Sequence, residues 1–168
     1  MATASASAQA GSSSSAPASS PSAQAAGSDG TCQPGDLAYA LGAKTGTTSQ
    51  PTQTVDLTNR ASAACTMTGF PGVDLVGAAN GQQNYTWSLE RQSKSYSTVT
   101  LAPGGTAHFD LIYLPGTSGG SGDITVFKMV ITPPNDYTEA ELTWNQSVVL
   151  QDGATHPGTY ISPVVSGS

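Results

Sequence analysis

The sequence predicts an all-β protein, an immunoglobulin-like sandwich of two sheets that follows a disordered N-terminal tail. From residue 35 on, short stretches rich in Val, Leu, Ile, Thr and Tyr alternate with turns of Gly, Pro, Asn and Asp. Within these stretches the apolar residues recur at every second position, as on a strand with one buried face. No stretch has a helical period over three turns. Eight or nine such strands favour two packed sheets, and a barrel is the alternative.

The N-terminal segment differs from the rest of the chain. Residues 1–30 are almost wholly Ala, Ser, Gly, Gln and Pro, and Asp29 carries the only charged side chain among them. Such a segment buries too little apolar area to offset its ordering entropy. We therefore predict a disordered tether over residues 1–30 and a single β-sandwich domain over residues 31–168.

Most of the expected strands have one apolar face, because successive side chains of a strand point to opposite sides. We expect these apolar faces, the two tryptophans included, to form the core. In chain order they are Leu37, Tyr39 and Leu41; Val55 and Leu57; Cys65 and Met67; Tyr85, Trp87 and Leu89; Val99 and Leu101; Ala107, Phe109, Leu111 and Tyr113; and Ala140, Leu142 and Trp144.

One stretch, ITVFKMVIT, is apolar on both faces. Strands of this kind are central in a sheet or covered on both sides. We expect Phe127, Met129 and Ile131 on one face and Val126, Lys128 and Val130 on the other.

Turn motifs separate the strands. The Asn-Gly pair of ANGQ, residues 79–82, is typical of a two-residue hairpin. In CTMTGFPGV, Gly69 and Gly72 tolerate positive φ, while Pro71 fixes its own φ. The strand that begins at Cys65 must therefore stop there and turn.

Cys32 and Cys65 are the two cysteines of the chain. In an extracellular domain such a pair most simply forms one disulfide. Closing a loop of about 34 residues would stabilise the fold by roughly 3–4 kcal/mol in the chain-entropy model, and would attach the first strand to the sheet where the tail ends. A redox or zinc site would need a C-x-x-C spacing, which this chain lacks. The residues before Cys32 do not form a lipid-attachment motif.

Charge and hydropathy restrict partners and location. The five basic residues are scattered along a chain of net charge −6, so no basic patch is available for nucleic acid. No apolar run reaches the roughly 18 residues of a transmembrane segment. An Ala/Ser/Gly-rich tether directly after Met1 is typical of a secreted or cell-surface protein whose signal or lipid-anchor segment has been removed.

Three stretches resemble a known family. The block TNRASAACTMTGFPGVDL is similar to the "L-T-N … C-x-L-x-G-[YF]-P-G-V" block of actinobacterial domain of unknown function 4232, and TLAPGGTAHFDL and VITPPN resemble two of its later blocks. The resemblance spans about residues 32–165. It implies a secreted protein or lipoprotein of Streptomyces-like or mycobacterial bacteria. The family's second cysteine pair is absent here, and the resemblance supplies no catalytic residues.

Candidate chemistry is sparse. His108 is expected on a strand and His156 in a loop, and neither has a nucleophile spaced beside it. Glu139 and Glu141 share the solvent face of one strand, which is more typical of a soluble edge than of a glycosidase pair. We therefore expect no catalytic residues.

Other single residues have simple interpretations. Lys128 raises the hypothesis of an intramolecular isopeptide bond, although a surface lysine is the simpler interpretation. Asp29, Asp123 and Asp152 stand near glycines but outside any spaced calcium loop. We expect no cofactor and no metal site. Asn84 and Asn145 are glycosylation sequons that matter only in a glycosylating host.

These observations favour a non-enzymatic extracellular or cell-envelope module with a binding or structural role. A protein or cell-wall ligand is the expected partner, through loops such as 77–83 and 114–122 at one end of the sandwich. A carbohydrate- or peptidoglycan-binding domain is the alternative, and an extracellular protease inhibitor is a third, less favoured one.

Overall fold

A computed structural model describes residues 30–117, 120–150 and 158–167; residues 1–29 of the predicted tether and His156 lie outside these ranges. Within them the protein is all β, and its one helix is the short 3-10 turn η1, Pro34–Asp36. The strands are β1 Leu37–Gly46, β2 Pro51–Asn59, β3 Cys65–Thr68, β4 Gly72–Ala79, β5 Gln82–Ser88, β6 Glu90–Arg91, β7 Thr98–Leu101, β8 Thr106–Ile112, β9 Asp123–Thr132, β10 Ala140–Val149, β11 Tyr160–Ile161 and β12 Val165–Ser166.

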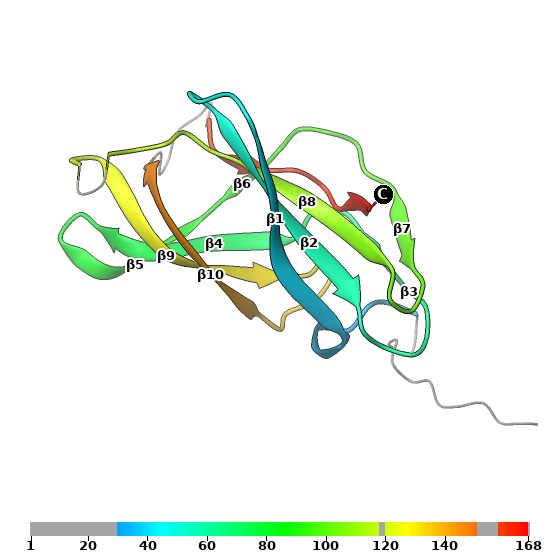
Figure 1. The fold of residues 1–168 in the computed structure, drawn as a ribbon. Coiled ribbons are helices and arrows are strands. Elements are labelled where there is room, and N and C mark those ends of the chain that lie inside the picture. The colour runs from blue at the N-terminus through cyan, green and yellow to red at the C-terminus, as the bar shows by residue number, and fades with distance from the viewer. Residues whose placement is uncertain (1–29, 118–119, 151–157, 168) are drawn as a thin grey trace, which may run out of the picture.

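The strands form two layers. One sheet has the order β1-β2-β8-β11-β6, with β12 also paired to β8, and the other has the order β10-β9-β4-β5. Figure 1 shows the first sheet lying across the second. A separate two-stranded sheet joins β3 to β7. All pairs are antiparallel except β6 with β11. The predicted β-sandwich is confirmed.

The core lies between the layers and is built from the alternating apolar faces. On β2 and β8, Val55, Leu57, Phe109 and Leu111 are fully buried, and β4 and β9 bury Leu75, Met129 and Ile131 against them. Burying each such side chain contributes about 1.5–3 kcal/mol. Trp87 and Trp144, at 5% and 4% exposure, belong to this core as expected.

The predicted alternation is wrong in the middle of β9. Val126 is buried and Phe127 is 42% exposed, the reverse of the expected faces. Val76 pairs with Lys128 and Gly77 with Val126, so Phe127 is an extra residue opposite β4. Such a bulge reverses which side chains face the core. The expected central position is confirmed, since β9 lies between β10 and β4.

The second half of β1 also departs from the prediction. Leu41 was expected in the core but is 41% exposed. β1 is an edge strand, and its register with β2 shifts between Leu41 and Lys44. Beyond this shift β1 is exposed, and it continues into the hairpin that leads to β2.

The tight hairpin predicted at residues 79–82 is present between β4 and β5. Asn80 and Gly81 both have positive φ, 51° and 78°, as a two-residue hairpin turn of this kind requires. Ala79 pairs directly with Gln82. This turn projects from one end of the sandwich (Figure 1).

A substitution at Gly77, which lies opposite the bulge in β9, tests that bulge. A Cβ at this position would lie 1.9 Å from the backbone oxygen of Thr125, so Gly77→Ala must displace main chain. We expect it to lower the free energy of unfolding by about 2–4 kcal/mol in urea denaturation. Gly35→Ala is the control, because a Cβ there meets nothing within 4 Å; its effect should stay within about 0.5 kcal/mol. Equal effects of the two changes would contradict the bulge.

Candidate functional site

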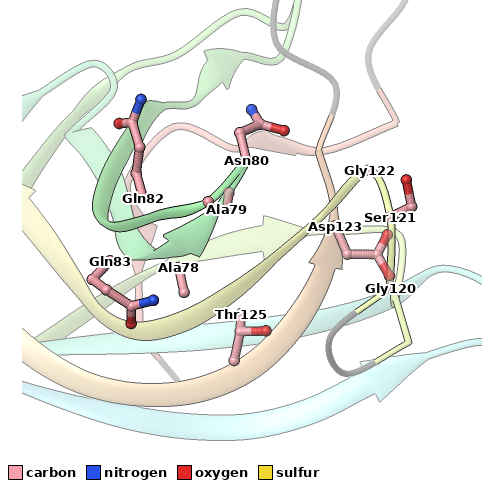
Figure 2. Close-up of a pocket in the computed structure, with 11 residues that line it drawn as sticks. Ala78, Ala79, Asn80, Gln82, Gln83, Gly120, Ser121, Gly122, Asp123 and Thr125 are labelled. Carbon is pink, nitrogen blue, oxygen red and sulfur yellow. The ribbon is translucent and has the colours of Figure 1, made fainter.

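Two segments far apart in the sequence meet at one end of the sandwich. Residues 78–83, around the β4–β5 turn, and residues 120–123 with Thr125, where β9 begins, line an open cavity of about 330 Å³ (Figure 2). We call this cavity the end pocket. The loops 77–83 and 114–122, expected to share one end, both contribute to it through their described residues.

The end pocket presents hydrogen-bonding groups. Asn80, Gln82 and Gln83 are exposed and carry carboxamides, which both donate and accept. Ser121 and Thr125, which carry hydroxyls, line the same cavity from the β9 side. This chemistry suits a polar ligand rich in hydroxyl or amide groups.

Asp123 supplies the carboxylate of the end pocket, and it also organises the loop before β9. Its Oδ2 accepts a hydrogen bond of 2.6 Å from the backbone N–H of Thr117. A Cβ on Gly116 or Gly120 would approach this carboxylate to 2.6 or 2.7 Å. The glycines of this loop therefore let the chain wrap closely around Asp123, a role that its sequence context did not reveal.

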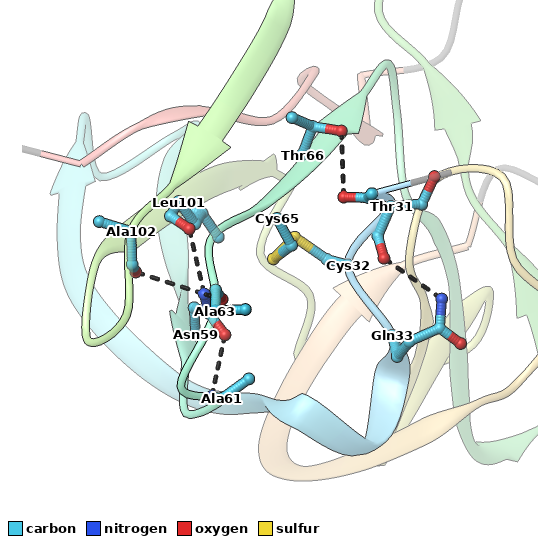
Figure 3. Close-up of a disulfide and its surroundings, with 11 residues drawn as sticks. Thr31, Cys32, Gln33, Asn59, Ala61, Ala63, Cys65, Thr66, Leu101 and Ala102 are labelled. Atoms are coloured by element: carbon cyan, nitrogen blue, oxygen red, sulfur yellow. Dashed lines mark hydrogen bonds between the residues drawn. A yellow bond between two sulfur atoms is a disulfide. The ribbon is translucent and has the colours of Figure 1, made fainter. Parts of the chain in front are cut away.

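The predicted disulfide joins Cys32 to Cys65 (Figure 3). The Cα atoms are 4.8 Å apart, and the two residues are only 1% and 4% exposed. Next to it, the backbone N–H of Cys32 donates to the oxygen of Thr66, and the N–H of Thr66 donates to the oxygen of Gly30. The disulfide thus attaches the segment before η1 to β3, in the two-stranded sheet.

Asn59 is a structural residue that the sequence interpretation missed. It is fully buried, and its Nδ2 donates to the backbone oxygens of Ala63 at 2.9 Å and Leu101 at 3.0 Å (Figure 3). Its Oδ1 accepts from the N–H of Ala61. Its position in the sequence could have indicated burial, because Asn59 is the next inward-facing residue of β2 after Val55 and Leu57.

The structure does not assemble the other candidate residues into one site. His108 lies on the outward face of β8 opposite Asp56, and neither residue lines the end pocket. Lys128 and Glu141 form an ion pair of 2.6 Å, with side chains 37% and 62% exposed. This geometry fits the surface-lysine interpretation of Lys128. Glu139 is exposed as well.

The remaining predictions concern sequons, metals and membranes. Both sequon asparagines, Asn84 and Asn145, are exposed. Across the described ranges, His, Cys, Asp and Glu side chains do not gather in threes that could hold a metal ion. No helix in that part of the chain has the length and apolar character to span a membrane.

A family model described as Domain of unknown function (DUF4232) matches residues 32–161. The chain belongs to this family. No curated protein matches the sequence. The DUF4232 match begins at Cys32 and ends in β11, so it includes both cysteines and the end pocket. Because the description names no activity, ligand or location, the match identifies the family alone.

Removing the disulfide tests its contribution to this DUF4232 domain. The double change Cys32→Ala and Cys65→Ala should lower the free energy of unfolding by about 3 kcal/mol, since the unfolded chain is no longer cross-linked. Urea denaturation with and without reductant measures this change in the free energy of unfolding. Reductant should lower the midpoint of the unmodified protein and leave that of the variant unchanged. Equal urea midpoints of the unmodified protein and the double variant without reductant would show that the cross-link contributes nothing to stability.

We predict that the buried Tyr39 makes the DUF4232 domain sensitive to alkali. Burial raises the pKa of Tyr39 well above its usual value of 10, and the negative charge of Asp136 raises it further. The hydroxyl has no hydrogen-bond partner among the described residues. The unfolded chain releases this proton first, so stability should be present at neutral pH and fall as pH rises beyond about 10.

Tyr39→Phe should reduce this alkaline loss without lowering stability at neutral pH, as measured by urea denaturation at about pH 7 and about pH 11. Tyr137→Phe is the matched control, because Tyr137 is 97% exposed. An alkaline loss of equal size in the Tyr39 variant and the unmodified protein would refute the assignment.

Proposed function

We propose that this chain is a non-enzymatic module that works in the cell envelope or outside the cell of an actinobacterium and binds a polar ligand in the end pocket. The observation that carries the proposal is the convergence of two remote loops. Together they present the carboxamides of Asn80, Gln82 and Gln83 and the hydroxyls of Ser121 and Thr125 in one open cavity.

The disulfide supports the extracellular location. Bonds of this kind persist in oxidising compartments and are rare in the cytosol. Cys32 and Cys65 are both buried, which is typical of a structural cross-link. The secretion implied by the sequence resemblance points the same way.

The chemistry of the end pocket supports binding over catalysis. General acid–base or nucleophilic catalysis needs a base or nucleophile held by an orienting partner. The carboxylate of Asp123 is instead engaged by the backbone of its own loop. Carboxamides and hydroxyls serve recognition, because they donate and accept hydrogen bonds at neutral pH without a change of charge.

A carbohydrate or peptidoglycan ligand is the more specific candidate. The hydrogen-bonding groups of the end pocket match the hydroxyl and acetamido groups of such a ligand. Stacking on tryptophan would not contribute, since Trp87 and Trp144 are both buried in the core. A ligand here would therefore be held mainly by hydrogen bonds.

Retention on purified peptidoglycan and cell-wall polysaccharide tests the ligand. We expect the full chain to be retained, and the double change Gln82→Ala and Gln83→Ala to weaken retention about tenfold through lost hydrogen bonds. Asn84→Ala is the control, an exposed amide on the same strand that does not line the end pocket. If the double variant is retained as well as the unmodified chain, binding does not use the end pocket.

The location has its own test. Fractionation of a native culture, followed by mass analysis without reduction, should find the mature chain outside the cytoplasm with Cys32 and Cys65 joined. A cytoplasmic product with both thiols free would contradict the extracellular assignment.

A further inference from the structure

A second cavity lies where the β1–β2 hairpin meets β10. It has a volume of about 360 Å³ and is lined by residues 44–48, Pro51, Tyr113, Pro115 and Gln146. We call it the lysine cavity. It shares no lining residue with the end pocket.

The lysine cavity combines an apolar base with a cationic rim. Tyr113 and Pro51 are buried, while Lys44 is exposed at the rim. The Lys44 Nζ lies 5.7 Å from the centroid of the Tyr113 ring and donates a 3.3 Å hydrogen bond to Gln146 Oε1. These two contacts hold the ammonium over the aromatic ring, within the usual cation–π range.

The charge of Lys44 is not paired with a carboxylate of the residues that the structure describes. Among the described residues, the one ion pair joins Lys128 to Glu141, and no carboxylate lies within ion-pair distance of Lys44. Arg60, Arg91 and Lys94 also lack an ion pair among the described residues, so Lys44 is distinguished by its contacts with Tyr113 and Gln146 in a cavity. Its donors remain available for an anionic ligand.

Tyr113 provides a second, independent observation. Its side chain is fully buried, yet its hydroxyl has no hydrogen-bond partner within the described part of the chain. The ring packs edge to face on Trp144, with centroids 5.2 Å apart, so its position is set by the core. A buried donor without a partner is costly and commonly marks the place of a water or ligand atom.

We propose that the lysine cavity binds a monocarboxylate with an apolar body. The carboxylate would pair with the Lys44 ammonium, and the body would lie against the exposed ring of Pro115 and hairpin residues 45–48, above the buried Tyr113 and Pro51. A single lysine matches the single charge of a carboxylate, whereas phosphate sites usually gather arginines or several backbone N–H groups. The proposal does not depend on the ligand of the end pocket.

Two sources supply this chemistry, the free C-terminus of a peptide and a small organic acid. Amide chemical shifts of the full, isotope-labelled chain should be followed during titration with N-acetyl-alanyl-alanine, its C-terminal amide, and benzoate. We expect the acids to shift residues 44–48 and Gln146, and the amide to bind at least tenfold more weakly. Tighter binding of the dipeptide than of benzoate identifies a peptide terminus, and the reverse identifies a small acid.

Charge-matched variants complete the test. Lys44→Met should lower the affinity for the acids about tenfold. Lys94→Met removes the same charge from an exposed residue outside the cavity and should leave the affinity unchanged. The proposal fails if the amide binds as well as the acid, if both variants weaken binding equally, or if no acid shifts the cavity residues at about 10 mM.

Discussion

The buried cross-link between Cys32 and Cys65 is the constraint on which one end of the molecule depends. No strand pairing connects β3 or β7 to the two larger sheets within the described residues. They are attached by the disulfide on one side, by Asn59, which bonds the backbone at Ala63 and Leu101, on the other, and by side chains of β3 and β7 that are buried in the common core. The β3–β7 pair thereby closes the sandwich at the end opposite the β4–β5 turn (Figure 1).

The other end is built around the connection from β8 to β9. The backbone N–H of Gly116 donates to the oxygen of Ser147, and that of Val149 donates to the oxygen of Leu114, so β10 holds this connection on one side. Pro115 lines the lysine cavity, and residues 120–123 line the end pocket. One segment thus borders two cavities of different chemistry, the first cationic over an aromatic base and the second rich in amides and hydroxyls.

The strand faces were predictable wherever the alternation runs unbroken. β2 and β8 followed the pattern because they pair with each other in an unbroken register, and the extra residue of the β1–β2 pair lies on β1. β9 did not, because the extra residue Phe127 becomes visible only when the strand is paired with β4. The exposure of Leu41 has a similar cause, since the register shift of β1 follows from its partner and its edge position.

The sequence by itself determined the all-β class, the tight turn at Asn80 and Gly81, and the pairing of two cysteines, since each depends on local periodicity, backbone preference or residue count. Only the tertiary structure decided which polar groups meet. Lys44 and Gln146 are 102 positions apart, and both cavities join residues from strands that are distant in sequence. Such meetings depend on which strands pair and in which register, and that is set by the packing of the whole core rather than by any one segment.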